Sequence, residues 1–141
     1  MGSTAGDVGS GSPAARLGFR PDMVVQELGW DEDVDEALRL EIEEQLGAEM
    51  VDGGSGDVVD GVLLWWRDDD GDLVDALIGS LTDLGEGGTI WLLTPKVGRP
   101  NAVDPADIAE AAPIAGLAQT TTAAVSKEWS ATRLIAPKTP A

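Results

Sequence analysis

Cysteine, histidine and tyrosine are all absent from this chain of 141 residues. Without cysteine the chain can form no disulfide, no thiolate nucleophile and no zinc–sulfur site. Without histidine it lacks the commonest general base and the commonest transition-metal ligand. These absences exclude the Ser–His–Asp and Cys–His schemes of nucleophilic catalysis, and they exclude every histidine-ligated metal centre.

Basic residues are also scarce, because nine lysines and arginines stand against 26 aspartates and glutamates, for a formal net charge of −17. A negative field of this size repels nucleic-acid phosphates and anionic membrane surfaces, so we expect neither as a partner. No apolar run approaches the roughly 20 residues that a membrane-spanning helix requires. The first residues show no basic segment followed by an apolar one, as a signal peptide would, so we expect a cytoplasmic protein.

The length of the chain fits a single domain. Residues 1–15 are rich in glycine, serine and alanine, and we expect them to form a flexible N-terminal tail. Residues 16–138 are then one α/β domain, and residues 139–141 are a short C-terminal tail.

Strand-like and helix-like apolar patterns alternate along the domain. Each expected helix begins near an aspartate that can cap its first turn, and a glycine stands at or directly after the end of each. The expected strands are 23–29, 58–66, 89–94, 120–126 and 129–136, and the expected helices run from Asp31 or Asp33 to Leu46, from Asp72 to Leu84 with a glycine turn at 85–88, and from Asp104 to Gly116.

Right-handed crossovers between successive strands make the first three strands parallel. The last two strands are joined by a tight turn and form an antiparallel hairpin at one edge of the sheet. The sequence therefore predicts a three-layer, Rossmann-like α/β fold with helices on both faces of a mostly parallel sheet. Class I methyltransferase-like sheets end in the same way, but a shared fold does not carry function with it.

Distinctive blocks of sequence occur at residues 24–31, 63–67, 90–100, 110–113 with 115–117, and 128–134. Together they resemble the actinobacterial family catalogued as domain of unknown function 3052. The resemblance spans about Arg16 to Lys138, and the Trp65-Trp66-Arg67 and Thr94-Pro95-Lys96 blocks make it specific. It implies an intracellular protein from a high-GC bacterium, and it implies no activity or ligand for any residue.

Two neighbouring tryptophans, Trp65 and Trp66, end one predicted strand, so their side chains point to opposite faces of the sheet. Both fit the core, and Trp66, next to the strand end, also fits the lining of a cleft. We expect Trp91 and Trp129 to be core residues.

Basic side chains directly follow two of the predicted parallel strands. Arg67 follows one and Lys96 follows the next, with Arg99 just beyond, and residues 87–103 contain no acid. A structural alternative stays open for all three cations, in which Arg67 pairs with the acids of residues 68–72 and the other two pair with the acidic surface.

The carboxyl ends of parallel strands meet at one edge of the sheet, where α/β domains bind their ligands. Arginine can grip a carboxylate or a phosphate with two parallel hydrogen bonds. The sequence therefore predicts a site for a small anionic metabolite at this edge. The predicted ligand-binding residues are Trp30, Trp66, Arg67, Thr94, Lys96 and Arg99.

No cofactor or metal is predicted. The segment after the first strand, residues 28–36, has one glycine and five carboxylates, whereas a phosphate cradle needs several glycines and no acids. S-adenosylmethionine is a cation and is not excluded by charge, but the missing glycine pair argues against it. The acidic run 68–72 does not fit a calcium-binding EF-hand, because the loop would need acids where Trp66 and Leu77 stand.

Three functions remain open. The first is a small non-catalytic protein of a regulatory type that binds a ligand or partner through the predicted cleft. The second is a degenerate methyltransferase-like transferase, which would need an aspartate or lysine as its acid–base group. The third is an acidic adaptor whose helix face at residues 33–45 docks a basic protein.

Overall fold

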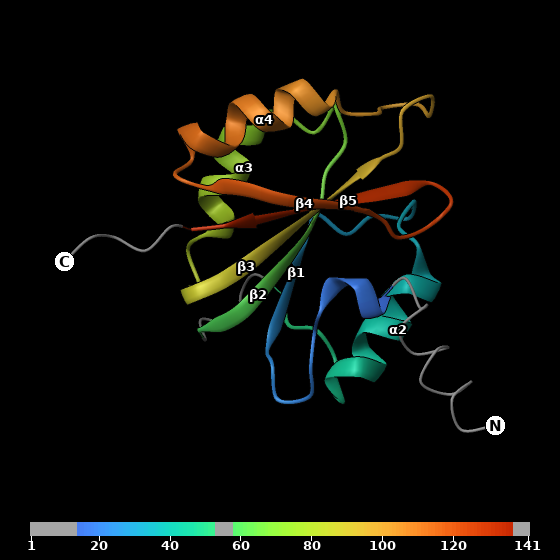
Figure 1. Cartoon of the computed structure of the whole chain (residues 1–141). Coiled ribbons are helices and arrows are strands. Elements are labelled where there is room, and N and C mark those ends of the chain that lie inside the picture. The colour runs from blue at the N-terminus through green and yellow to red at the C-terminus, as the bar shows by residue number, and fades with distance from the viewer. Residues whose placement is uncertain (1–13, 53–57, 137–141) are drawn as a thin grey trace.

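The computed structural model places a five-stranded sheet between two layers of helices (Figure 1). It describes residues 14–52 and 58–136, so most of the two predicted tails lies outside the described residues. In chain order the elements are η1 (Ala14–Leu17), β1 (Val25–Leu28), α2 (Glu36–Leu46), β2 (Val59–Trp65), α3 (Leu73–Ser80), β3 (Leu84–Pro95), α4 (Pro105–Ile114), β4 (Ala118–Ala124) and β5 (Trp129–Ile135).

The strand order in the sheet is β1-β2-β3-β5-β4. The first three strands are parallel, as predicted. β5 is inserted between β3 and β4 and runs antiparallel to both, so the predicted hairpin closes the sheet and β4 is its edge strand. The prediction of a Rossmann-like, mostly parallel sheet with a terminal antiparallel hairpin is confirmed.

The strand order reverses at β1, which has a parallel neighbour on each side. β2 lies on one side, and on the other Gln26 forms an isolated parallel bridge with Val51. The bridge is closed by the Glu27 amide, which donates to the Val51 carbonyl at 2.8 Å. The chain thus leaves β1 through α2 toward one side and returns to build β2 on the other. In open α/β sheets, the carboxyl ends of the strands at such a switch point are where ligands bind.

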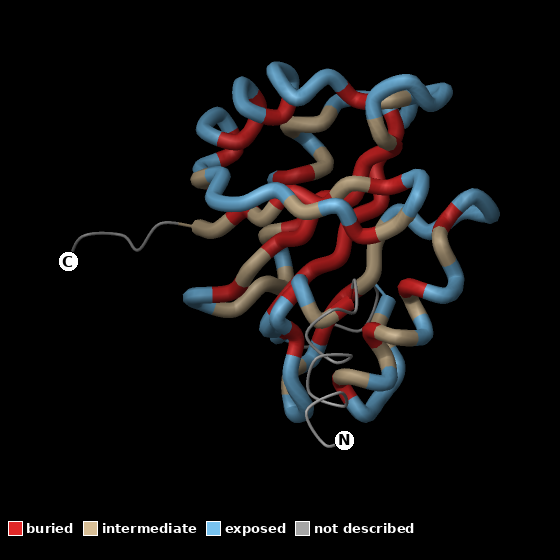
Figure 2. Tube along the Cα trace, turned by 45° about the vertical axis from the view of Figure 1, so that its right-hand side comes forward, coloured by how far each residue is buried: buried red, intermediate tan, exposed pale blue. Residues whose placement is uncertain are grey.

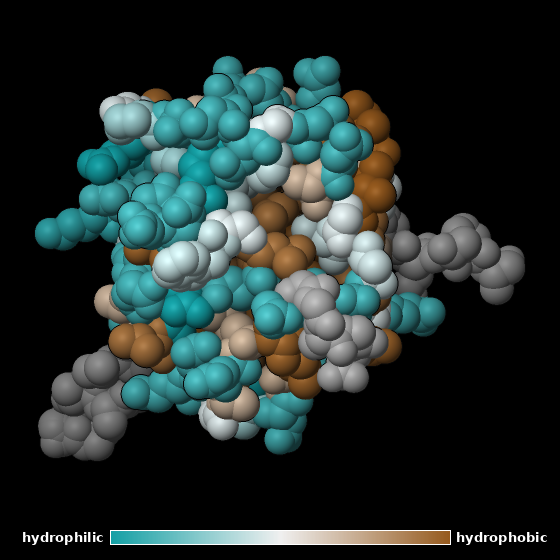
Figure 3. Space-filling view, turned by 180° about the vertical axis from the view of Figure 1, so that it is seen from behind, coloured by the Kyte–Doolittle hydropathy of each residue, from teal (hydrophilic) through white to brown (hydrophobic). Residues whose placement is uncertain are grey.

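The two faces of the sheet bury separate apolar layers (Figure 2). Trp65 and Trp91 pack beneath α2 and η1, whereas Trp66 and Ile90 pack beneath α3 and α4. The opposite orientation of Trp65 and Trp66 is therefore confirmed, and both side chains are buried. The outer surface is mostly hydrophilic on the face that Figure 3 shows, with apolar side chains gathered near its centre.

The beginning of α2 differs from the prediction. Asp35, rather than Asp31 or Asp33, caps the helix and accepts a hydrogen bond from the Leu38 amide at 3.0 Å. Three closely spaced aspartates, Asp31, Asp33 and Asp35, could each cap this helix. Asp33 is not the cap, because its carboxylate is bonded to Arg67. The end is as predicted, because Gly47 adopts a left-handed conformation with φ 74°.

The region between α3 and β3 also differs. The sequence leaves the N-cap open between Asp70 and Asp72, and the structure selects Asp72. The helix α3 ends at Ser80 instead of Leu84. Leu84 pairs with Val59 of β2, so β3 begins there rather than at Thr89. The predicted glycine turn at residues 85–88 is a bulge within β3, since the register resumes only where Thr89 faces Gly61.

The described part of the chain begins with η1, which packs against the sheet. Ala14 and Leu17 of η1 are buried, and the indole Nε1 of Trp91 donates to the Leu17 carbonyl at 3.0 Å. Ala14, which the sequence assigns to the tail, is therefore a core residue. None of the helices in the described part of the chain has the length and apolar character needed to cross a bilayer.

Candidate functional site at the strand switch point

A hollow of about 500 Å³ opens at the switch point, beside the carboxyl ends of β1 and β2 and against α3. Its floor is apolar and its rim carries acids. The lining residues are Leu28, Gly29, Trp30, Asp31, Leu64, Trp65, Trp66, Arg67, Asp70, Ala76 and Gly79.

Trp30 is the exposed aromatic side chain of this hollow, with 52% of its surface accessible. Its indole Nε1 donates to Glu36 at 3.2 Å, and Glu36 also accepts a hydrogen bond from Arg39 at 2.9 Å. Arg39 in turn binds Glu27 of β1, which accepts from the Trp65 indole at 2.9 Å. A chain of hydrogen bonds therefore holds the exposed indole against the fixed end of the sheet.

Arg67 lies at the centre of the strand-end loops and is buried, with 6% exposure. Its Nε and Nη2 atoms donate to the two carboxylate oxygens of Asp33, and its Nη1 donates to the Gly29 carbonyl at 2.7 Å. Asp70 accepts a longer hydrogen bond from Nη1 at 3.3 Å. The guanidinium also lies over the Trp129 ring, 5.3 Å from its centroid.

These contacts bear directly on the predicted anion contact of Arg67. Each of its three nitrogens already has an acceptor within the protein, so an anion would have to displace Asp33 or Asp70. The structural alternative, pairing with the acids of residues 68–72, is confirmed through Asp70. Asp33 is the closer partner, and sequence analysis did not identify it.

The six predicted ligand-binding residues do not share one cleft. Trp30, Trp66 and Arg67 line the hollow at the switch point. Thr94 and Lys96 line a different, much smaller cavity of about 90 Å³ beside α4. Arg99 lies outside both and pairs with Glu128 of the β4–β5 turn at 3.2 Å. The prediction of a single cleft is therefore corrected. β2 ends beside Leu93, whereas β3 continues to Pro95 alongside β5, so the residues after β3 lie against the β4–β5 turn and away from the hollow.

The described residues contain no group of three or more acidic side chains placed to hold a metal ion. Two acids of the run 68–72 instead accept hydrogen bonds from backbone amides nearby in the sequence. Asp70 accepts from the Arg67 amide at 2.9 Å, and Asp72 caps α3 by accepting from the Val74 amide at 2.8 Å.

The Arg67–Asp33 pair makes stability depend on pH. The hydrogen bond from Arg67 holds the pKa of Asp33 below its ordinary value, although partial burial opposes the shift. A carboxyl whose folded-state pKa is depressed contributes stability above its unfolded pKa of about 3.9, and loses it as the pH falls through the folded value. We expect Asp33→Asn to flatten the loss of stability below about pH 4.

Urea denaturation at a series of pH values between neutrality and acid measures this effect. Asp69→Asn is the control, because Asp69 is an exposed aspartate of the neighbouring loop. It should keep the acid dependence of the wild type. Equal acid curves for wild type and Asp33→Asn would show that the pair is not linked to folding.

Comparison with known proteins gives one family. A family model described as "Protein of unknown function (DUF3052)" matches residues 14–138. An uncharacterised protein of Mycobacterium tuberculosis is 52% identical over 125 residues, which cover 89% of this chain and 78% of the relative. An uncharacterised protein of Mycobacterium bovis matches with the same identity and coverage.

Solved structures with a similar fold include methyltransferases. A SAM-dependent methyltransferase from Aquifex aeolicus has a TM-score of 0.59 at 12% identity over 89% of each chain. A SAM-bound amino pentose methyltransferase from Micromonospora echinaspora has a TM-score of 0.56 at 11% identity over 97% of each chain. At this level of identity the likeness concerns the fold alone.

Proposed function

The chain belongs to the family described as protein of unknown function DUF3052, and we propose that it is a non-catalytic protein that binds a small molecule in the hollow at the switch point. One observation carries the proposal. A half-exposed indole stands over an apolar hollow at the position where α/β sheets bind ligands, and a hydrogen bond to Glu36 holds that indole in place.

The lining indicates the chemistry of the ligand. Leu28, Leu64 and Trp66 form an apolar floor, and Trp30 offers a flat aromatic surface. The charged groups at the rim are Asp31 and Asp70, which disfavour an anion. We therefore favour a flat heteroaromatic ligand that is neutral or positively charged.

The same lining favours binding over catalysis. Histidine, cysteine and tyrosine are missing from the whole chain, so the acid–base groups at the hollow are its aspartates, Asp31 and Asp70. Arg67, which could polarise a reacting group, is bonded to Asp33 and Gly29. In this proposal Arg67 shapes the hollow and does not contact the ligand.

An anionic metabolite, as the sequence predicts, would instead use Lys96 and Arg99 at the end of β3. Arg99 is exposed and its partner Glu128 is exposed as well, so an anion could replace that ion pair at little cost. The small size of the adjoining cavity makes this the weaker of the two sites.

The acidic adaptor is a third proposal and concerns the helix face at residues 33–45. Several of its acids are already engaged, since Asp33 binds Arg67 and Glu43 accepts from the Met50 amide at 2.9 Å. The exposed Leu40 and Glu44 remain on its outer side. A basic partner would therefore meet fewer unpaired carboxylates than the sequence suggests.

Trp30 provides the test of the binding site. We expect ligands found by screening heteroaromatic metabolites against tryptophan fluorescence to lose about tenfold or more in affinity in Trp30→Ala, since base–aromatic stacking is worth about 1–3 kcal/mol. Ile114→Ala, which truncates another exposed apolar side chain, on α4, is the control and should change affinity less than about twofold. Hits that bind both variants equally would place the site elsewhere.

S-adenosylmethionine distinguishes the binding protein from the transferase. We expect a dissociation constant weaker than about 10 µM, or roughly 7 kcal/mol, by calorimetry. The loop between β1 and α2 has a single glycine, Gly29, where a cofactor-binding turn needs several. The same loop is bonded to Arg67 through the Gly29 carbonyl and Asp33. Tighter binding would favour the methyltransferase-like enzyme instead.

A further inference from the structure

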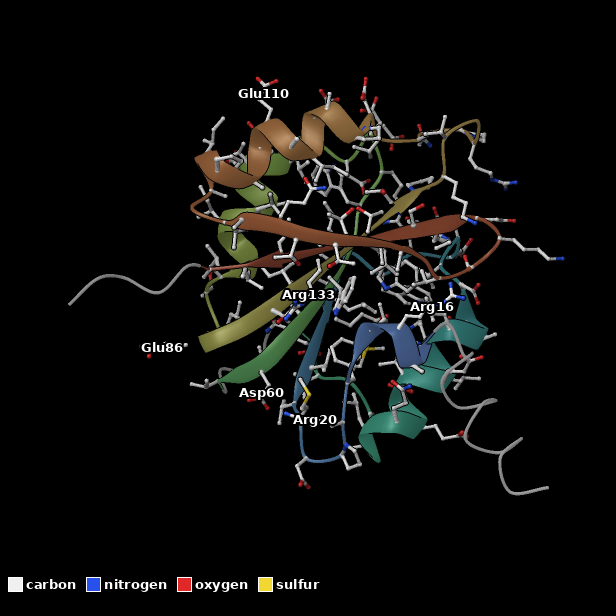
Figure 4. The ribbon with its side chains drawn as sticks, in the orientation of Figure 1. Arg16, Arg20, Asp60, Glu86, Glu110 and Arg133 are labelled. Atoms are coloured by element: carbon white, nitrogen blue, oxygen red, sulfur yellow. The ribbon has the colours of Figure 1, made fainter. Side chains whose placement is uncertain are left out.

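A second cavity, about twice the volume of the hollow, lies at the opposite end of the strands. It measures about 1030 Å³ and lies between the N-terminal segment 16–23 and the amino-terminal ends of β2 and β3. Its lining includes Arg16 and Arg20 from the N-terminal segment and Arg133 from β5 (Figure 4). Three of the nine basic residues of a very acidic protein therefore line one cavity.

The sheet register explains how Arg133 reaches this cavity. On β5 it faces Trp91 of β3 and Thr121 of β4. Cross-strand partners project from the same face of a sheet, so Arg133 lies on the face that η1 partly covers. Thr89, which is two residues before Trp91 on β3, shares this face and also lines the cavity.

The cavity arginines differ from the other arginines in their partners. Arg39, Arg67 and Arg99 each form an ion pair with a carboxylate. Within the described part of the chain, the side chains of Arg20 and Arg133 have no hydrogen-bond or ion-pair partner, and Arg16 donates only to the Ala124 carbonyl, at 2.7 Å.

Acids are present at the cavity but do not neutralise these arginines. Asp60 and Glu86 line it, and one oxygen of Asp60 accepts from the Val24 amide at 2.8 Å. Their carboxylates offer acceptors for hydroxyl or amine groups, whereas the guanidinium groups offer paired donors for an anion.

We propose that this cavity binds a phosphorylated small molecule, with Arg20 and Arg133 contacting the phosphate and Asp60 or Glu86 accepting hydrogen bonds from its polar body. Phosphate suits the site because its oxygens match the guanidinium fork. A bounded cavity with acids in its lining and a net charge of −17 favours a small ligand over a nucleic acid. The site is separate from the hollow at the switch point.

Calorimetry of the full chain with inorganic pyrophosphate at low salt tests the two arginines. We expect Arg20→Gln and Arg133→Gln each to weaken binding about tenfold or more, as for loss of a charged hydrogen bond. Arg99→Gln removes the same charge at the other end of the strands and should stay within about twofold of wild type. Equal losses in all three variants, or no binding up to about 10 mM, would overturn the proposal.

Two glutamates separate a local site from the effect of net charge. Glu86 lines the cavity, whereas Glu110 lies on α4 on the other side of the sheet (Figure 4). Removing the charge of Glu86 should strengthen pyrophosphate binding about two- to fivefold, and Glu110→Gln should leave it unchanged. Identical effects of the two variants would contradict a site in this cavity.

Two further measurements complete the test. Thermal melting checks that the variants are folded, and Arg20, which is exposed, keeps the test valid if Arg133→Gln is destabilised. A single-stranded oligonucleotide is the second ligand. If it binds more tightly than pyrophosphate and loses affinity in Arg20→Gln, the small-molecule assignment is wrong.

Discussion

Arg67→Ala is expected to lower the free energy of unfolding by about 2–4 kcal/mol, because a buried side chain loses its charged hydrogen bonds and leaves a cavity. The substitution deletes the hydrogen bonds to Asp33 and to the Gly29 carbonyl, together with the contact to the Trp129 ring. It also leaves an empty volume next to Trp129, which packs edge-to-face on Trp65 with ring centroids 4.9 Å apart. Chemical denaturation followed by tryptophan fluorescence measures the change.

Arg99→Ala is the control for this experiment. It removes an arginine from an ion pair whose two side chains are about half exposed, at 47% and 53%. Such surface pairs contribute about 0–1 kcal/mol. If Arg67→Ala were as mild as Arg99→Ala, the internal partners of Arg67 would not be structural, and the predicted anion contact would again be the better explanation of this residue.

Gly29→Ala should cost at least about 3 kcal/mol, because two separate effects act at this position. Gly29 has a positive φ of 77°, which disfavours any side chain. A Cβ atom there would also overlap the carbonyl oxygen of Trp65 on the neighbouring strand. The ends of β1 and β2 would have to separate, and the Gly29 carbonyl would move away from Arg67.

Comparison with Gly47→Ala separates the steric overlap at Gly29 from the cost of the backbone conformation. Gly47 has nearly the same backbone conformation, with φ 74°, but open space where the Cβ would stand. We expect a loss of about 1 kcal/mol, which is the ordinary penalty of a left-handed alanine. Equal losses for the two variants would show that the close approach of β1 and β2 is not tight in solution.

Much of the fold could be predicted because it depends on local patterns. The run of apolar residues that ends in Trp65 and Trp66 marks a strand covered on both faces, and both tryptophans are buried on opposite sides. The cap at Asp72 and the stop at Gly47 follow from the chemistry of helix ends. The bulge at residues 85–88 could not be predicted, since glycines typical of a turn also fit a bulged strand.

The candidate site was harder to predict because its contacts are long-range. Asp33 and Arg67 are 34 positions apart in the sequence, and many other acids could have served as the partner. The division of the predicted cleft depends on how the β4–β5 turn meets the end of β3, where the Lys96 amide donates to the Glu128 carbonyl at 2.8 Å. No property of Lys96 or Glu128 alone indicates that contact.

The contacts of Arg67 also have a consequence for the order of folding. This one side chain joins the loop after β1, the end of β2 and the first residue of β5, which are distant along the chain. Contacts between such distant segments form only after the intervening chain has been ordered, so we expect them to be absent from the folding transition state. Loss of Arg67 should then act mainly by accelerating unfolding, while the rate of folding stays close to that of the wild type.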